Sequence, residues 1–480
     1  MNKKIVLSIL GKILWAEAAL LVLPLIVSII YGNSCIPAFL ITIAVAVIIA
    51  LPLIFLCKTD NKRIYSKEGF VIVSLAWIIM SVIGCLPFVI SGEIPSFFDA
   101  LFETVSGFTT TGASILTDIE GMSEGLLFWR SFTHWIGGMG VLVFVLALSQ
   151  ELPDRSIHIM RAEMPGPIVD KLVPKAKETA KILYLIYIVL TLAEIVILVL
   201  CKMPLFEAVV HTFGTAGTGG FGVKADSMGS YSPVIQWVIA VFMFIFGINF
   251  NLYYLILLKR IRSVFRSSEL WVYVGVGVVS CALITFNIYD SCEGLSEALR
   301  LSAFQVSSVM TTTGYATADF NLWPGFSKTL LLILMFMGAC AGSTAGGLKV
   351  SRVIILVKGM RRELHRLLHP RSVRTLKLEG KRLDEQTLSS ANSYLTVYVA
   401  SVVVIFLLLS IDNFDIETNF SATVACFNNI GPGLGVVGPA GNFSEYSVFS
   451  KIILTAAMLL GRLEIFPLLL CFSPATWLKK

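Results

Sequence analysis

TTTGAS, at residues 109–114, ends a short apolar stretch, and three related endings recur later in this 480-residue chain. They are AGTGGFG at 216–222, TTTGYA at 311–316 and NNIGPG at 428–433. The matching glycines are Gly112, Gly219, Gly314 and Gly431, which are separated by 107, 95 and 117 residues. A single such motif carries little information, but four copies at a similar period indicate an internal repeat. We therefore expect four copies of one structural unit.

The stretches that precede these four endings are semi-apolar and too short to cross a bilayer. They read PSFFDALFETVSGF, PLFEAVVHTFG, LSEALRLSAFQVSSVM and ETNFSATVACFN. A crossing helix needs about 20 apolar residues, whereas runs of about 10 to 14 are typical of re-entrant segments. The repetition favours half-helices that enter and leave one face of a membrane. Glycine turns that cap four helices lying on the outer surface are the alternative.

The composition indicates a membrane protein. Apolar residues make up 56% of the chain and charged residues only 14%, whereas soluble domains are about one quarter charged. Mean hydropathy is +0.83, so there is too little charge to cover a soluble protein of this length. The nine cysteines are scattered and form no C-x-x-C, which gives no support to a disulfide framework or a metal cluster.

The apolar runs predict ten spans. Seven runs lack Asp, Glu, Lys and Arg, at 36–57, 70–91, 131–149, 234–258, 270–289, 329–348 and 394–411. Three others carry charge: 14–31 contains Glu17, 182–201 contains Glu194, and 451–470 contains Arg462 and Glu464. The predicted fold is an all-α polytopic membrane protein with a two-helix N-terminal hairpin and four pseudo-fourfold helix–pore-loop–helix units. The expected divisions are 1–63 for the hairpin and 64–155, 156–262, 263–382 and 383–480 for the units.

The basic residues fix the expected orientation. Of the 37 Lys and Arg, 30 lie in the segments 1–13, 58–67, 150–181, 259–269, 349–390 and 479–480. Cytoplasmic loops carry such an excess, so these segments and both termini are expected in the cytosol. The net charge of +6 therefore belongs to membrane topology, and we expect no nucleic-acid partner.

Four loops of non-helical backbone at membrane depth need a common purpose, because such backbone is tolerated only where it is buried in protein or lines water. Rings of backbone carbonyls can replace the hydration shell of an alkali cation, and glycine permits the close approach and the backbone angles required. The half-helices would also direct the negative ends of their dipoles toward the centre. The candidate ion-binding residues are Thr110, Thr111, Gly112, Thr218, Gly219, Thr312, Thr313, Gly314, Asn429, Ile430 and Gly431.

Three further segments carry a resemblance to a known family. NNIGPGLG at 428–435, AGSTAGGLK at 341–349 and GRLEIFP at 461–467, together with the first hairpin, make the chain similar to the Trk/Ktr/HKT superfamily, closest to its TrkH/TrkG branch. The resemblance covers essentially the whole chain and implies a potassium filter built from the four loops. Sodium-preferring members often have serine at the first filter position, so Gly112 favours potassium. The second loop has extra glycines, and its register is the least certain.

The resemblance also implies a gate. Residues 338–347, GACAGSTAGG, place glycines within a predicted span at a density that breaks a helix. The matching segment of the family obstructs the pore beneath the filter, which makes Gly342, Ser343, Thr344, Ala345, Gly346 and Gly347 the candidate gate residues. Close packing of small residues against another helix is the alternative. A phosphate-binding loop is excluded because GSTAGGLK lacks the G-K-[ST] ending.

Arg462 lies about ten residues into the last apolar span. A charge at that depth usually faces a cavity or a partner, and the resemblance places it in the pore as an electrostatic barrier to cations. Snorkelling to an interface is the alternative. Glu464, two residues later, projects from a different face of a helix and is expected to bind a helix of the same chain, while His134 and His211 are expected to be structural.

The expected setting and partners rest on the resemblance. It implies a multi-pass protein of a bacterial cytoplasmic (inner) membrane, in contact with lipid and assembled as a homodimer. A TrkA-like cytosolic nucleotide-binding ring is the expected regulator, since this chain contains no nucleotide motif. The basic segment 349–390 is either a solvated face or the docking surface for that ring, and 150–181 is a second candidate contact. No organic cofactor is expected, and K⁺ is the transported ion.

Two other functions compete with a channel-like pore. An obligate symporter, coupling K⁺ to H⁺ or Na⁺, would need a titrating group or a second ion site, for which Glu194 and Glu464 are the acidic candidates deep in spans. An intramembrane lipid-processing enzyme would need clustered carboxylates or a nucleophile and base. The outward loops offer isolated carboxylates, Asp99, Glu103, Asp226 and Glu297, with no repeated spacing. We therefore expect a transporter and not an enzyme.

Overall fold

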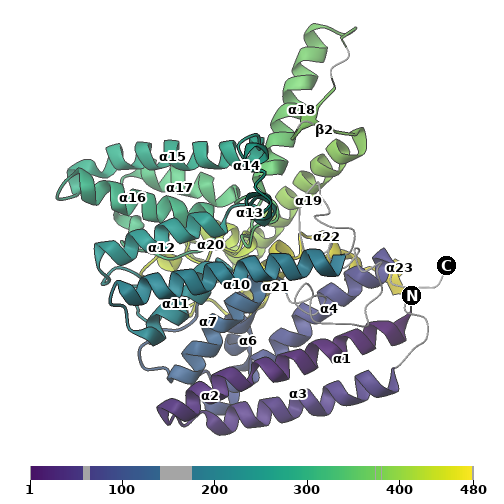
Figure 1. The fold of residues 1–480 in the computed structure, drawn as a ribbon, viewed down its shortest axis with the longest axis vertical. Helices are drawn as coiled ribbons and strands as arrows, with labels where there is room; N and C mark the ends of the chain where they lie inside the picture. The colour runs from purple at the N-terminus through teal and green to yellow at the C-terminus, as the bar shows by residue number, and fades with distance from the viewer. Residues whose placement is uncertain (1, 58–64, 141–175, 373–374, 380, 478–480) are drawn as a thin grey trace.

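The structure is a computed structural model that describes residues 2–57, 65–140, 176–372, 375–379 and 381–477. The regular secondary structure of the described residues is helical, apart from one short antiparallel hairpin, β1 (Lys377–Leu378) and β2 (Lys381–Arg382), and an isolated bridge between Met337 and Leu348. In Figure 1 the long helices run in roughly the same direction through the body, while α18 (Val350–Leu368) projects beyond it. The beginning of α1 (Lys3–Leu20) and α23 (Pro474–Trp477) lie at the same edge.

The N-terminal segment forms the expected hairpin. It consists of α1, α2 (Val22–Tyr31) and α3 (Ile36–Leu56), and α1 packs along α3. The two helices cross closely at Gly11, where an added Cβ would lie 2.8 Å from Cβ of Leu53. Small residues permit such close helix contacts within a membrane.

Four repeats follow the hairpin, each with a long first helix, a short helix and a second long or broken helix. Repeat 1 has α4 (Ser66–Gly84), α5 (Leu86–Ser91), α6 (Phe97–Phe108) and α7 (Glu124–Gly138). Repeat 2 has α10 (Ala176–Leu200), α11 (Leu205–Gly217), α12 (Pro233–Phe246), α13 (Phe250–Leu257) and α14 (Ile261–Val264). Repeat 3 has α15 (Ser268–Ile288), α16 (Leu295–Met310), α17 (Gly325–Phe336) and α18. Repeat 4 has α19 (Glu385–Leu409), α20 (Ile416–Phe427), α21 (Val448–Arg462) and α22 (Phe466–Phe472).

The short helices α6, α11, α16 and α20 are the four half-helices expected from the sequence. Their carboxyl-terminal halves are buried almost completely. Each one also packs against the second long helix of the preceding repeat, in the pairs α21 with α6, α7 with α11, α12 with α16, and α17 with α20. These contacts close the four repeats into a ring, with the half-helices inside.

The outer helices face lipid. Large apolar side chains are exposed along α3, α10, α15 and α19, for example Ile48, Leu192, Phe286 and Leu407. Among the described residues, six helices are long and apolar enough to cross a membrane, or eight when each bent pair is counted as one span. The shorter helices α7 and α17 occupy the places of the other two predicted spans.

Several predicted spans differ from the helices that form. The span at 234–258 bends by 89° between α12 and α13, and the span at 451–470 bends by 120° between α21 and α22. The span at 329–348 is helical only to Phe336, in agreement with the interruption predicted at 338–347. For the span at 131–149, α7 begins earlier, at Glu124, and residues 141–149 lie outside the described residues.

The bend between α21 and α22 has a local cause. Glu464 and Ile465 both have positive φ, of 53° and 66°. The Phe466 N–H donates to the Glu464 carbonyl at 2.7 Å, which closes a γ-turn. A β-branched residue at positive φ is strained, so the surrounding packing holds this break in place. Arg462 occupies the last turn before it.

Short 3-10 turns follow α15 and α19 and occur in the connections from α16 to α17 and from α20 to α21. They lie at Tyr289–Ser291, Phe320–Leu322, Ser410–Asp412 and Gly435–Val437.

Candidate functional site

The four half-helices end in one repeated hydrogen-bond pattern. In repeat 1 the Thr110 N–H donates to the Gly107 carbonyl at 3.0 Å and the Thr111 N–H donates to the Ser106 carbonyl at 2.8 Å. The same pair of bonds follows α11, α16 and α20, through the amides of 218 and 219, 312 and 313, and 429 and 430. Each helix thus ends in a Schellman motif, which satisfies carbonyls that its last turn would otherwise leave unpaired.

The Schellman motifs place unusual residues in the left-handed region. Glycine is the usual residue there, but these loops use Thr110, Thr218, Thr312 and Asn429, with φ between 56° and 57°. Left-handed backbone is unfavourable for a β-branched residue, and such strain costs about 1 to 3 kcal/mol per residue. Asparagine tolerates this conformation, but three strained threonines at equivalent positions indicate a site where geometry matters more than stability.

A second set of left-handed residues lies two positions later and fixes the register of the repeat. These are Gly112, Gly220, Gly314 and Gly431, with φ between 76° and 94°. The prediction that Gly219 is the counterpart of Gly112 is therefore wrong by one residue. The second loop contains several glycines, so the sequence alone could not select the one with positive φ. Gly219 instead corresponds to Thr111.

The second set of glycines also shows how the loops meet. A Cβ built on Gly112 would lie 1.9 Å from the carbonyl oxygen of Gly219. Gly220 has the same relation to Thr313 at 2.1 Å, and Gly314 to Ile430 at 2.0 Å. The ring closes where a Cβ on Gly431 would lie 2.8 Å from the Thr111 oxygen. Each loop therefore touches the next in chain order, and no larger residue fits at these contacts.

Side chains also join the loops. The loops that follow α6, α11, α16 and α20 are numbered 1 to 4. Hydroxyl pairs lie within loops 1 and 3, at 2.8 Å for Thr109 and Thr111 and 2.7 Å for Thr311 and Thr313. The Asn429 amide of loop 4 donates to the Thr111 hydroxyl at 2.9 Å. Outside the ring lies a cavity of about 140 Å³ that residues from all four loops line, including the four left-handed glycines.

A buried ion pair supports the outer side of the ring. Arg130 of α7 donates to Glu103 of α6 at 2.6 Å and to the Gly222 carbonyl at 3.1 Å. Glu103 also accepts from the Ser114 hydroxyl and the Ile115 amide, each at 3.0 Å. Glu103 is thus not isolated as the sequence suggested. Its partner is 27 residues away in the chain, and only the fold brings the two together.

The predicted gate residues lie directly beneath the ring. Between α17 and α18 the chain is non-helical from 337 to 349. The Gly346 N–H donates to the Thr312 hydroxyl at 2.7 Å, and a Cβ on Gly346 would lie 2.7 Å from the Asn428 carbonyl oxygen. This segment, hereafter the gate segment, therefore contacts loops 3 and 4 directly.

One carboxylate anchors both ends of the gate segment. Glu269, in the first turn of α15, accepts from the Ala341 N–H at 2.8 Å and from the Ser351 N–H at 3.0 Å. The Glu269 N–H in turn donates to Glu379, which follows β1, at 3.1 Å. A chain of hydrogen bonds thus connects the short hairpin to the gate segment.

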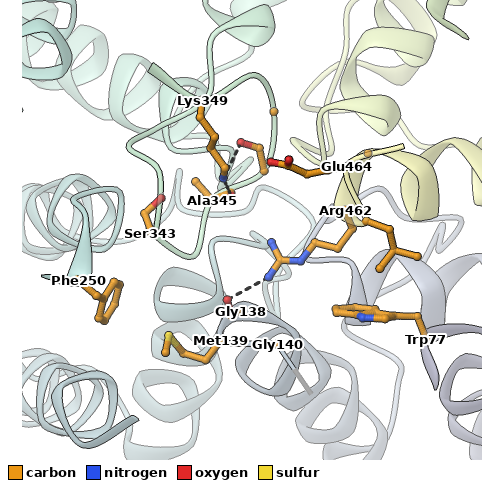
Figure 2. Close-up of a pocket in the computed structure, with 15 residues that line it drawn as sticks. Trp77, Gly138, Met139, Gly140, Phe250, Ser343, Ala345, Lys349, Arg462 and Glu464 are labelled. Carbon is orange, nitrogen blue, oxygen red and sulfur yellow. Dashed lines mark hydrogen bonds between the residues drawn. The ribbon is translucent and has the colours of Figure 1, made fainter. Parts of the chain in front are cut away.

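Arg462 extends from α21 toward Gly138 of α7, as Figure 2 shows. Its guanidinium donates to the Thr344 carbonyl of the gate segment at 2.8 Å and to the Gly138 carbonyl of α7 at 3.0 Å. Trp77 lies alongside, with its ring centre 5.8 Å from the guanidinium carbon. The guanidinium is thus bound to backbone carbonyls inside the protein, and its expected place in a pore stays a prediction.

Lys349 lies on the other side of the same cavity in Figure 2. Its ammonium donates to the Ala345 carbonyl and to the Gly346 carbonyl, the latter at 3.3 Å. Lys349 is 1% exposed. It is the first residue of segment 349–390, which the sequence predicts to be a solvated face or a docking surface, and its burial agrees with neither. The cavity that these groups line measures about 40 Å³, which holds a few water molecules at most.

Glu464 forms an ion pair with Arg352 of α18, and the Arg352 guanidinium also lies 4.0 Å from the Tyr394 ring centre. The expectation that Glu464 binds a helix of the same chain is confirmed. His211 of α11 is 3.1 Å from the Tyr231 hydroxyl and 3.4 Å from the Tyr315 hydroxyl, behind loops 2 and 3. Within the described ranges no cluster of three or more His, Cys, Asp or Glu is arranged to hold a metal.

Three comparisons with known proteins agree with this architecture. A family model described as TrkH, a cation transport protein, matches residues 35–288 and 292–479. The chain is 39% identical over 487 residues to the Trk system potassium uptake protein TrkH of Salmonella typhimurium, covering 99% of this chain and 100% of the relative. It is 32% identical to the Trk system potassium uptake protein TrkG of Escherichia coli, covering 99% and 98%.

The fold agrees as well. The crystal structure of the potassium transporter TrkH from Vibrio parahaemolyticus matches with a TM-score of 0.90 and 33% sequence identity, over 100% of both chains.

Proposed function

Because this chain belongs to the TrkH family of cation transport proteins, and is a multi-span potassium uptake transporter of a bacterial Trk system and not an enzyme, we propose that the ring of four loops is its potassium filter. The observation that carries the proposal is the fourfold repeat of one backbone conformation. A ring in which every loop has the same pattern of left-handed residues, and touches the next, presents equivalent carbonyl groups around one axis.

The residues proposed to bind the ion lie in these loops. They are Thr110, Thr111, Gly112, Thr218, Gly219, Gly220, Thr312, Thr313, Gly314, Asn429, Ile430 and Gly431. Carbonyl oxygens take the place of water around K⁺. The carboxyl ends of α6, α11, α16 and α20 add the negative ends of four helix dipoles. The contacts between neighbouring loops hold the ring at one size, so the smaller Na⁺ gains less from entering it.

The gate segment and Arg462 are proposed to close the path below the filter. Residues Gly342 to Gly347 and Arg462 line the small cavity, or in the case of Thr344 bind the Arg462 guanidinium. Arg462 places a fixed positive charge where K⁺ must pass, at a depth where charge is weakly screened. Opening requires the Arg462 contacts to Thr344 and Gly138 to break and the gate segment to withdraw.

The regulator is proposed to act from the cytosolic side. The gate segment continues directly into α18, which projects from the body in Figure 1. A TrkA-like nucleotide-binding ring that moves α18 or the β1–β2 hairpin would pull on the gate segment. We propose the homodimer and the cytosolic position of both termini on the same basis. The second candidate contact, at 150–181, lies outside the described residues up to residue 175.

The obligate-symport alternative has fewer candidates than the sequence offered. Of the two candidates, Glu464 is bound to Arg352, and Glu194 is buried in α10. Liposomes that contain the purified protein separate the two models. We expect K⁺ flux that follows the K⁺ gradient when H⁺ and Na⁺ are equilibrated across the membrane. Flux that requires a gradient of either ion would instead establish symport, and equal permeation of Na⁺ would contradict the potassium filter.

A further inference from the structure

Loop 2 lacks the hydroxyl pair that stiffens loops 1 and 3. Thr109 and Thr111 correspond in loop 2 to Gly217 and Gly219. Loop 4 also lacks the pair, but the Asn429 amide donates to the Thr111 hydroxyl and to the Met458 carbonyl, at 2.9 and 3.0 Å. Loop 2 is therefore the most glycine-rich part of the ring and the one whose own side chains contribute least to its shape.

A histidine from the neighbouring repeat lies against loop 2. His134 of α7 is fully buried. The Phe221 N–H, just after the ring, donates to His134 Nε2 at 3.3 Å. An amide can only donate, so Nε2 is the acceptor and Nδ1 carries the hydrogen. Nδ1–H then donates to the Gly107 carbonyl of α6 at 2.7 Å. The imidazole thus connects the end of half-helix α6 to the backbone of loop 2.

The contact with loop 2 is also one of shape. A Cβ built on Gly219 would lie 2.3 to 2.5 Å from three atoms of the His134 ring. The Phe221 ring lies over the imidazole with its centre 4.2 Å away. One turn earlier on α7, Arg130 covers the Phe221 ring at 3.5 Å and donates to the Gly222 carbonyl. The imidazole therefore occupies the space that a side chain at position 219 would need.

The arrangement is specific to this pair of repeats. Gly137 and Gly461 each lie against the last carbonyl of a half-helix, that of Phe108 and that of Phe427, so they are counterparts. His134 then corresponds to Met458, whose backbone carbonyl accepts from Asn429 of loop 4 and whose thioether cannot form the two hydrogen bonds of an imidazole. A histidine occurs where the adjacent loop is richest in glycine.

We propose that His134 is a positioning residue for ion selectivity: it holds loop 2 at the radius that the threonine pairs give loops 1 and 3. The inference rests on the proposed potassium filter. It deepens that proposal, because it assigns part of the selectivity to a side chain that does not itself contact the ion.

The inference is tested by adding a methyl group at Gly219, against the His134 ring, with and without that ring present. Gly219 is not one of the glycines with positive φ, so its backbone can accept alanine. The atoms nearest to an added Cβ belong to the His134 ring. We expect Gly219→Ala to lower K⁺ flux in liposomes about tenfold, because overpacking at a rigid contact displaces backbone. In a His134→Ala background the same substitution should change flux less than about twofold. His134→Ala alone should lower the K⁺ to Na⁺ permeability ratio while K⁺ flux persists.

Two controls keep the outcomes separate. His211, the other buried histidine near the ring, lies away from Gly219, so Gly219→Ala in a His211→Ala background should cost as much as in the unmodified protein. His134→Asn is a second background in case His134→Ala does not fold, which size-exclusion chromatography reports. Equal costs of Gly219→Ala with and without His134 would overturn the inference. If Gly314→Ala also leaves flux and selectivity unchanged, the filter proposal itself fails.

Discussion

The ring of loops has one backbone conformation repeated four times, whereas the region beneath it differs from repeat to repeat. In the ring all four repeats use the same turn, with left-handed residues at equivalent positions and glycines that touch the next loop. Beneath it the repeats diverge: α12 and α13 bend by 89°, α21 and α22 bend by 120°, and the chain between α17 and α18 is non-helical from 337 to 349. The four repeats therefore share one loop conformation in the ring but differ in how their second long helices are broken.

The difference separates two physical requirements. A site for a spherical ion needs equivalent oxygen ligands around an axis, and four copies of one structural unit supply them. A gate must have two states, and a single segment with its own partners can move without deforming the ring. Glu269 and Lys349 bind backbone groups of the gate segment, and Arg462 binds its Thr344 carbonyl.

The largest expected effect comes from breaking the symmetry of the ring. Gly314→Ala introduces a Cβ at φ of +87° that would lie 2.0 Å from the Ile430 carbonyl oxygen. We expect K⁺ flux in liposomes to fall at least about a hundredfold, since both the backbone angle and the contact exclude alanine. Gly325→Ala is the matched control, because no atom lies within 4 Å of its Cβ. Unchanged flux in Gly314→Ala would remove the ring from the path.

The second expected effect lies in the unrepeated region. Arg462→Ala removes a fixed positive charge and its bonds to the Thr344 and Gly138 carbonyls. We expect K⁺ flux without any cytosolic partner to rise about tenfold, since a desolvated charge in a narrow path is a steep barrier. The measurement is ⁸⁶Rb⁺ uptake into liposomes, with Arg366→Ala, 70% exposed on α18, as the control. A flux equal to that of the unmodified protein would show that the barrier lies elsewhere.

A third substitution tests the contribution of loop 1 to ion selectivity. Gly112→Ser adds a side chain at φ of +78° beside the Gly219 carbonyl of the next loop. We expect K⁺ flux to fall, as in Gly314→Ala, and the K⁺ to Na⁺ permeability ratio of the remaining current, taken from reversal potentials, to be about fivefold lower, because one quarter of the ring no longer has the repeated backbone. Gly275→Ser on α15, where the Cβ meets no atom within 4 Å, serves as the control. An unchanged ratio would mean that loop 1 does not contribute to selectivity.

The smallest expected effect concerns the anchor of the gate segment. Lys349→Met preserves the length of the side chain but removes the ammonium that binds the Ala345 and Gly346 carbonyls. We expect partner-independent K⁺ flux to rise about threefold, since hydrogen bonds to charged groups contribute about 1.5 to 3 kcal/mol and loss of the charge also lowers the barrier. Lys358→Met, whose ammonium binds the Lys377 carbonyl at 2.8 Å near the cytosolic hairpin, should leave flux unchanged. A decrease in Lys349→Met would reverse the assigned role.

The sequence predicted the repeated part of the molecule well. The length of the apolar runs indicated the four half-helices, and the density of glycine at 338–347 indicated the break after α17. The register of loop 2 could not be obtained that way, because adjacent glycines at 219 and 220 differ only in φ. That angle depends on how the loop contacts its neighbours, which a single sequence does not encode in any local pattern.

The groups that support the ring were also beyond prediction from the sequence. Arg130, Glu103 and His134 occur in apolar or semi-apolar segments without a motif. Apart from Ser114 and Ile115, which bind Glu103 from the adjoining loop, their partners lie 27 to 92 residues away. Their roles therefore follow only from the packing of α7 against α6 and α11. Lys349 looked like the first residue of a basic cytosolic segment, and only the structure shows that it is buried against the Ala345 and Gly346 carbonyls.

The most direct test of the central claim is to locate the ion. Crystals or frozen samples of the protein in rubidium chloride would be examined for Rb⁺, by anomalous scattering in the crystalline case. We predict at least one Rb⁺ on the axis between the four loops, enclosed by backbone carbonyl oxygens from all four repeats, including those of Thr111, Gly219 and Ile430. Rb⁺ bound at another place along the path, with none between the loops of a protein that conducts it, would contradict the account.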